Sequence, residues 1–183
     1  EVLQTSELGF CLGVRKAVEL AQRVAREAVG SGRGVWTLGP LIHNYRVVRA
    51  LESLGVKTAR GLGDVPSGDT LILPSHGARP EFIAEAEARG VHLEDATCPL
   101  VRKVQIAARR LRDEGHEVIL VGDPQHTEVA AVVGWAGGGV RVVQTPEELD
   151  ELAQLGKVAV VSQTTQRPET VEALVGRLRE KGY

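Results

Sequence analysis

The residues of this chain that could do chemistry share one kind of position: each follows an apolar, strand-like run and precedes a helix-like one. Cys11 and Cys98 occupy such junctions, in the segments GFCLGV and DATCPLV. In an open α/β fold these junctions lie outside the carboxyl ends of the strands, where ligands bind. The positive end of the following helix favours the thiolate, the form that binds metal. The two thiols are therefore candidate metal ligands.

The cysteines are far apart in the sequence, unlike the closely spaced ligand pairs of structural zinc sites. Isolated thiolates suit an iron–sulfur cluster held where several domains meet, although such a cluster ordinarily takes three or four thiolates. For either cysteine alone, a buried thiol with no chemical role is the alternative. Spacing by itself leaves both interpretations open.

Three of the five histidines share the junction position: His43 in LIHN, His76 in SHG and His126 in DPQHTEV. Asn44 follows the first of them. Hydrogen-bond donors at helix N-termini suit a diphosphate, because the free N–H groups and the helix dipole attract anions. A zinc site is the alternative, but no pair of histidines has the i, i+4 spacing of a helical zinc motif.

A carboxylate and a hydroxyl complete the candidate site. Glu128 lies at a helix start two residues after His126, and Thr164 lies in the segment SQTT. A first-turn carboxylate often only stabilises its helix. Beside an anionic substrate, however, Glu128 could deliver a proton, and Thr164 could relay it or orient a substrate hydroxyl.

The elements that position these residues alternate between strands and helices, which predicts an α/β fold of mainly parallel sheets flanked by helices. Strands are expected at 2–5, 34–38, 70–73, 92–95, 117–121, 140–143 and 157–161, and helices at 14–29, 45–54, 80–89, 100–114, 128–134, 146–152 and 168–181. The midpoint at Thr97-Cys98-Pro99 predicts two similar domains. The first, 1–97, would carry Cys11, His43 and His76, and the second, 98–183, would carry Cys98, His126, Glu128 and Thr164.

Composition narrows the class of protein. The chain has 183 residues, 43% of them hydrophobic and 25% charged, with a net charge of −2. That balance gives no support for nucleic-acid or membrane-surface binding. No apolar run reaches the roughly 18 residues that span a bilayer, and no signal peptide is evident, so we expect a cytoplasmic protein. The sequence contains no Met, and we expect it to be part of a longer protein.

Taken together and in order, GFCLGV, LIHN, SHG, DATCPLV, GDPQHTEV and SQTT resemble the IspH/LytB family of 4-hydroxy-3-methylbut-2-enyl diphosphate reductases. The resemblance covers essentially the whole chain. It implies a trefoil of three α/β domains around a central [4Fe–4S] cluster, of which this chain would be the first two.

By that resemblance, Cys11 and Cys98 would be cluster ligands, His43, His76, His126 and Asn44 would hold the substrate diphosphate, and Glu128 and Thr164 would be catalytic, with Thr164 near the substrate hydroxyl. The implied reaction is a two-electron reductive dehydroxylation that yields isopentenyl and dimethylallyl diphosphate in the non-mevalonate pathway of isoprenoid biosynthesis. Because no flavin or nicotinamide motif is evident, electrons would come from an external donor such as a ferredoxin or flavodoxin.

The family's third cysteine belongs to its third domain, which this sequence lacks. Residues 1–183 are therefore expected to be inactive alone. Two alternatives remain: a non-enzymatic module that binds a diphosphate through its histidines, and a homodimer that pools two cysteines from each copy around one cluster.

Overall fold

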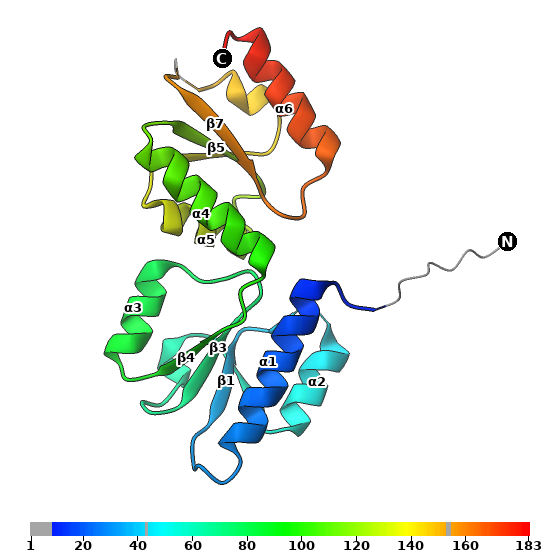
Figure 1. Ribbon diagram of the computed structural model, residues 1–183, viewed down its shortest axis with the longest axis vertical. Coiled ribbons are helices and arrows are strands. Elements are labelled where there is room, and N and C mark those ends of the chain that lie inside the picture. The colour runs from blue at the N-terminus through cyan, green and yellow to red at the C-terminus, as the bar shows by residue number, and fades with distance from the viewer. Residues whose placement is uncertain (1–8, 43, 153–154) are drawn as a thin grey trace, which may run out of the picture. The chain divides into compact units, whose positions relative to one another are not determined.

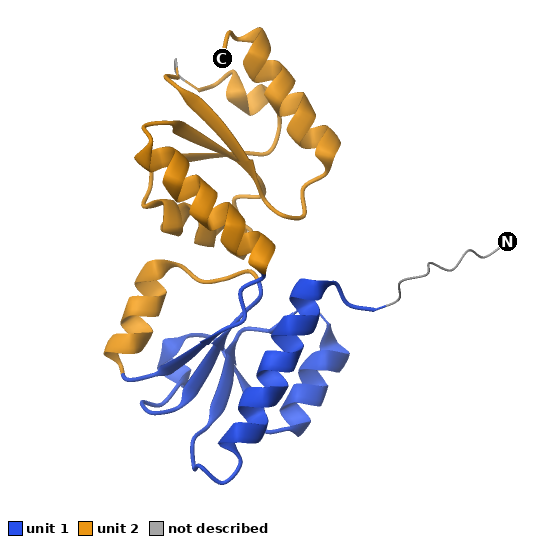
Figure 2. Cartoon of the chain, in the orientation of Figure 1, with its two compact units in different colours: residues 1–75, 90–98 blue, residues 76–89, 99–183 orange. Residues whose placement is uncertain are grey.

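The computed structural model describes residues 9–42, 44–152 and 155–183, which form an α/β fold with two parallel sheets (Figure 1). The chain divides into two compact units (Figure 2). Unit 1 comprises residues 1–75 and 90–98, and unit 2 comprises residues 76–89 and 99–183. Cys98 thus groups with unit 1 and His76 with unit 2, whereas the sequence placed each in the other domain.

Unit 1 is built on a four-stranded parallel sheet in the order β2-β1-β3-β4. Its strands are β1 (Val35–Leu38), β2 (Val56–Ala59), β3 (Thr70–Leu73) and β4 (His92–Asp95), and its helices are α1 (Leu12–Ala28), α2 (Tyr45–Ser53) and the short 3-10 helix η1 (Leu62–Asp64). Ala17, Ala21 and Val24 of α1 lie on one helical face at three- and four-residue steps. That face packs against the sheet in a core with Val35 and Ile72.

Unit 2 contains a three-stranded parallel sheet in the order β6-β5-β7. Its elements are α3 (Pro80–Ala88), α4 (Pro99–Asp113), β5 (Glu117–Val121), α5 (Thr127–Ala136), β6 (Val140–Val143), η2 (Glu147–Leu149), β7 (Val158–Ser162) and α6 (Pro168–Glu180). Alternate residues of the central strand β5 point to opposite faces. Val118 and Leu120 pack into the core that includes α4 and α5, whereas Ile119 and Val121 pack toward α6.

The chain repeats one order of elements. Helix, strand, helix, strand, 3-10 helix, strand and helix follow one another from α1 to α3 and again from α4 to α6. In unit 1 a fourth strand, β4, then pairs with β3. Strand β7 is the counterpart of β3 in the second repeat. It lies at the edge of the described sheet and is half-buried along its whole length, whereas every residue of β3 is buried.

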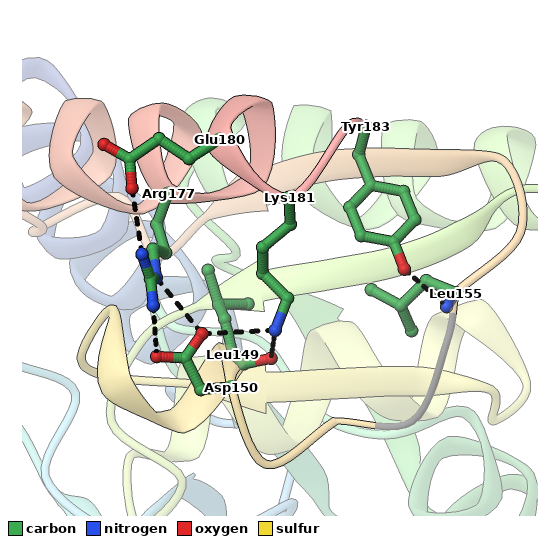
Figure 3. Close-up of polar contacts among 7 residues, drawn as sticks. All are labelled: Leu149, Asp150, Leu155, Arg177, Glu180, Lys181 and Tyr183. Atoms are coloured by element: carbon green, nitrogen blue, oxygen red, sulfur yellow. Dashed lines mark hydrogen bonds and ion pairs between the residues drawn. The ribbon is translucent and has the colours of Figure 1, made fainter.

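A polar cluster joins η2 to α6 in unit 2 (Figure 3). The carboxylate of Asp150 accepts hydrogen bonds from Nε and Nη2 of Arg177, at 3.1 and 2.8 Å, and from Nζ of Lys181 at 3.1 Å. Arg177 also contacts Glu180 at 2.9 Å. The Tyr183 hydroxyl accepts a hydrogen bond from the backbone N–H of Leu155 at 2.8 Å.

Most of the predicted elements are present, with three differences in the described residues. The 3-10 helix η1 was not predicted. Strand β2 was not predicted, because its middle residues Lys57 and Thr58 are exposed and it has no apolar run. The expected helix at 146–152 is only the three-residue η2. The strand predicted at 2–5 lies outside the described residues.

Candidate functional site

The two cysteines lie at equivalent positions at the starts of long helices. Cys11 is the N-cap residue of α1, and its carbonyl accepts the hydrogen bond from Arg15 N at 3.0 Å. Cys98 directly precedes Pro99, the first residue of α4, and its backbone N–H donates to the Ser75 carbonyl at 2.8 Å. Both thiols are free, Cys11 exposed and Cys98 partly buried.

The two sulfur atoms approach each other around Gly13, in unit 1. A Cβ placed on Gly13 would lie 2.6 Å from Sγ of Cys98 and 4.0 Å from Sγ of Cys11. Any side chain at residue 13 would therefore collide with the Cys98 thiol. Gly13 has an ordinary helical position, so the sequence needs glycine here for space rather than for backbone conformation.

The loop that carries Cys98 is held in shape by a neighbouring carboxylate. Oδ1 of Asp95 accepts hydrogen bonds from the backbone N–H of Thr97, at 2.9 Å, and from the Thr97 hydroxyl. The Ala96 N–H donates to the Leu73 carbonyl at 3.2 Å, which attaches the loop to the end of β3. These contacts fix the backbone from which the Cys98 thiol projects.

The donor set fits part of a thiolate-bound metal centre. Two free thiols around one glycine are the soft ligands that iron–sulfur clusters require. Among the described residues, however, no group of three or more His, Cys, Asp or Glu side chains is close enough to hold a metal ion. The described part of the chain therefore offers two candidate ligands, Cys11 and Cys98.

In unit 2, Glu128 and Thr164 form a direct pair at the carboxyl ends of two adjacent strands. Glu128 is 3% exposed, and Oε1 accepts from the backbone N–H of Thr164 at 2.7 Å. Oε2 accepts from the Thr164 hydroxyl at 2.9 Å. The sequence singled out both residues, and the structure brings them together from the first turn of α5 and the end of β7.

His126 caps α5 with its side chain. Nδ1 accepts a hydrogen bond from the backbone N–H of Glu128 at 3.1 Å. An accepting Nδ1 has no proton, so the neutral ring carries its proton on Nε2. The same contact that begins the helix therefore prepares Nε2 as a hydrogen-bond donor, the role that an anionic ligand needs.

Gln163 joins the loops of this site and was not among the predicted site residues. It is 5% exposed, and its Oε1 accepts from the Asp123 N–H at 3.1 Å. Its Nε2 donates to the Thr165 hydroxyl at 3.0 Å. A Cβ on Gly122 would lie 3.1 Å from this amide oxygen and 2.8 Å from Cγ2 of Val129, so the packing is tight. Its position in SQTT was the available signal.

The other predicted ligand residues are distributed as follows. Asn44, in unit 1, is the N-cap of α2, and its Oδ1 accepts from the N–H groups of Arg46 and Val47 at 3.1 and 3.4 Å. This cap leaves the amide nitrogen as the group that could contact a ligand. His76 is partly buried in unit 2. His43 lies outside the described residues.

The predicted site residues divide between the units: Cys11, Cys98 and Asn44 belong to unit 1, and His76, His126, Glu128 and Thr164 belong to unit 2. The sequence assigned the two thiols to separate domains. Both belong to unit 1, because β4, the strand that leads to Cys98, pairs with β3 of that sheet.

A sequence model of the LytB protein family matches residues 2–183. The chain belongs to the LytB family. A relative from Dehalococcoides mccartyi (strain CBDB1), named 4-hydroxy-3-methylbut-2-enyl diphosphate reductase, is 40% identical over 164 residues, which are 89% of this chain and 56% of the relative. A relative of the same name from Geotalea daltonii is 39% identical over 182 residues, 100% of this chain and 63% of the relative.

Solved structures agree with this LytB assignment. A structure of (E)-4-hydroxy-3-methyl-but-2-enyl diphosphate reductase, described as the terminal enzyme of the non-mevalonate pathway, is 39% identical, with a TM-score of 0.87 over 94% of this chain and 61% of its own. The corresponding reductase from Plasmodium falciparum is 29% identical, with a TM-score of 0.88 over 96% and 55%. This LytB chain therefore spans little more than half the length of these relatives.

No helix in the described part of this LytB chain is long and apolar enough to cross a membrane.

Proposed function

We propose that the complete protein containing this chain is a cytoplasmic 4-hydroxy-3-methylbut-2-enyl diphosphate reductase that forms isopentenyl and dimethylallyl diphosphate. The observation that carries the proposal is the approach of the Cys11 and Cys98 sulfur atoms around Gly13, in a chain whose relatives are named for this reaction. The glycine is needed for space, which is expected if both thiols serve one bulky ligand.

In this proposal Cys11 and Cys98 hold a [4Fe–4S] cluster, which supplies Lewis acidity and electrons when bound. A third cysteine comes from a further domain outside residues 1–183. An external carrier such as a ferredoxin or flavodoxin delivers the electrons.

The polar residues bind and orient the substrate. His126 offers Nε2–H to a diphosphate oxygen, because its Nδ1 is engaged by the Glu128 N–H. His43, His76 and the amide nitrogen of Asn44 are proposed to share this task. Donors at several strand ends neutralise the diphosphate through hydrogen bonds and helix dipoles, so no lysine-rich loop is required.

In this proposal Glu128 and Thr164 deliver protons to the substrate. The Thr164 hydroxyl donates to Oε2 of Glu128 at 2.9 Å, so the pair is a continuous path between a buried carboxyl and a hydroxyl at the surface of unit 2. Reductive dehydroxylation releases water and protonates carbon, and a positioned carboxyl group can supply the protons. The backbone bond from Thr164 N to Oε1 fixes the carboxyl plane.

The test compares the cluster-loaded, full-length protein with its Glu128→Gln variant. Gln keeps the size and accepts from Thr164 N, so the variant should fold and bind substrate normally. Its turnover with a chemical reductant should fall by about 10²- to 10⁴-fold, the usual contribution of a positioned acid. Turnover within a few-fold of wild type would remove Glu128 from the mechanism.

Calorimetry with the substrate separates the reductase from a diphosphate-binding module without enzymatic activity. The module requires tight binding by the cluster-free protein and no turnover by the loaded one. The reductase requires substrate-dependent turnover by the loaded protein.

A further inference from the structure

Helix α4 concentrates positive charge more than any other described helix. Its sequence PLVRKVQIAARRLRD has five basic residues and a single acidic one, although the whole chain has a net charge of −2. Lys103, Arg109 and Arg110 are exposed. A basic patch on an otherwise slightly acidic chain attracts an acidic partner and steers its approach.

A groove of about 630 Å³ lies along this helix, beside α5, within unit 2. Its lining includes Arg102, Gln105, Ile106, Arg109, Arg110 and Trp135. Ile106 is 61% exposed, and the Arg102 guanidinium lies over the Trp135 ring at 5.2 Å. An apolar centre with a charged rim is the composition of a protein interface.

The rim arginines can turn to a partner. Arg109 contacts Asp113 at 3.9 Å and Arg110 contacts Glu114 at 3.4 Å, and all four side chains are at least half exposed. Exposed pairs of this kind stabilise a helix little. Carboxylates of a docked protein can therefore replace them at small cost.

Gln105 indicates that the occupant is a polypeptide. The residue is 1% exposed and lines the groove, and neither Nε2 nor Oε1 has a hydrogen-bond partner among the described residues. Buried amides are almost always hydrogen-bonded. A peptide group that enters the groove offers both an acceptor and a donor, which is what this amide needs.

The groove also lies close along the chain to a proposed cluster ligand. Helix α4 begins at Pro99, directly after Cys98. Ile106 is eight residues after Cys98 in the sequence, which corresponds to roughly 12 Å along a helix axis at 1.5 Å per residue.

We propose that the groove on α4 is the docking site of a small acidic electron-carrier protein. This proposal rests on the proposed function, in which one turnover takes two electrons and two protons, breaks the substrate C–O bond and releases water. The carrier is oxidised by one electron in each of two encounters. Its carboxylates contact Arg109 and Arg110, an apolar side chain covers Ile106, and its backbone pairs with Gln105.

The test uses the full-length, cluster-loaded protein with two electron sources. Reduced methyl viologen needs no docking site, whereas a reduced plant-type ferredoxin is a small acidic protein. In the double variant Arg109→Glu/Arg110→Glu, kcat/KM for ferredoxin should fall by about tenfold or more, mainly through KM. The viologen-driven rate should stay within about twofold, and higher salt should reduce the ferredoxin-driven rate of wild type more than that of the variant.

Arg179→Glu is the matched control. Arg179 is an exposed arginine on α6 outside the groove, and its reversal should leave both rates unchanged. The proposal is overturned if the double variant accepts electrons from ferredoxin as well as wild type does, or if it loses both activities equally. A wild-type dimer that the double variant converts to monomers would also overturn it, because the groove would then bind a second copy.

Failure of the proposed reductase function can be distinguished from failure of the proposed docking site. Wild type without viologen-driven turnover would contradict the reductase itself. Calorimetric titration with ferredoxin still decides the docking site in that case: binding that the double variant weakens supports it, and equal or absent binding overturns it.

Discussion

Gly13 matters because it has no Cβ atom. Its missing Cβ leaves the space in which the Cys98 thiol sits, 2.6 Å from where that carbon would lie. A metal centre that uses both thiols therefore depends on a residue with no chemistry of its own.

Gly13→Ala should displace the Cys98 side chain. Overpacking of this kind destabilises a fold by about 1–3 kcal/mol. The variant should lose stability in urea unfolding, and the full-length protein should bind less iron.

Gly176→Ala is the contrasting change. Gly176 lies inside α6 with open space around it and no positive φ, so alanine there should stabilise the protein by about 0.5–1 kcal/mol. Equal effects of the two substitutions would contradict the steric argument for Gly13.

Thr164 can be tested for its contact with Glu128. Thr164→Val keeps the shape but removes the hydroxyl that donates to Oε2, so a buried carboxylate oxygen loses its donor. Such a loss destabilises by about 1–3 kcal/mol, measurable by urea unfolding. Thr164→Ser retains the hydroxyl and should recover most of the difference. If Ser and Val behave alike, the hydroxyl contact contributes nothing.

Among individual residues, the sequence singled out candidate chemical groups but not the residues that position them. Glu128 and Thr164 were predicted from their junctions, and the structure joins them. Gly13 and Gln163 were not predicted as site residues, because their roles depend on atoms distant in the sequence: Cys98 for one, and Asp123 and Gly122 for the other.

Among the elements, η2 and α6 are joined by apolar packing of Leu149 and by the carboxylate of Asp150, which accepts hydrogen bonds from two residues of the α6 end. The hydrogen bond from Arg177, followed by that from Lys181, lowers the pKa of Asp150 below its ordinary 3.8. The hydrogen bonds that Arg177 donates to Asp150 and then to Glu180 raise the pKa of its guanidinium above the ordinary value.

A lowered pKa in the folded state makes this contribution dependent on pH. Asp150 stabilises the fold fully above pH 3.8, and the effect is lost as the pH falls through the lowered folded value. Asp150→Asn should therefore reduce the free energy of unfolding near neutral pH and have progressively less effect in acid. The effect should be small because the pair is exposed. Urea unfolding across the pH range measures it, and a difference that does not change with pH would contradict this account.

Secondary structure was predictable where burial imposes a pattern. The central strand β5 is a continuous apolar run because helices cover both its faces, and it was predicted at its observed bounds. Among the described strands β2 pairs only with β1, and it exposes its middle residues, so it has no such run. η2 follows a proline that resembles a helix start, but it ends after three residues.

For the whole molecule, the order of elements repeats along the sequence, whereas the grouping of elements into compact units depends on packing. Each repeat begins with a helix that follows a cysteine, and that regularity is visible in the sequence. Helix α3 packs against α5, however, so it groups with unit 2, and the β4–β3 pairing keeps Cys98 in unit 1. Such packing between distant segments leaves no local signature.

The two thiols of residues 1–183 should be insufficient for a stable cluster. Reconstitution with iron and sulfide should give the fragment little iron that survives desalting, whereas the full-length protein should retain a cluster and turn over substrate. A stable cluster with turnover in the fragment would contradict the proposal of an additional domain. A dimer that pools four thiols is the remaining way in which residues 1–183 could hold a cluster, and native mass measurement would identify it.

The half-buried strand at the margin of the second sheet has a practical consequence. An extended peptide can pair with the apolar run of this edge strand, Val158-Ala159-Val160-Val161. Exposed edge strands of this kind promote aggregation. On concentration, residues 1–183 alone should therefore become turbid at a lower protein concentration than the full-length protein does. The aggregates should show the infrared band of intermolecular β-sheet.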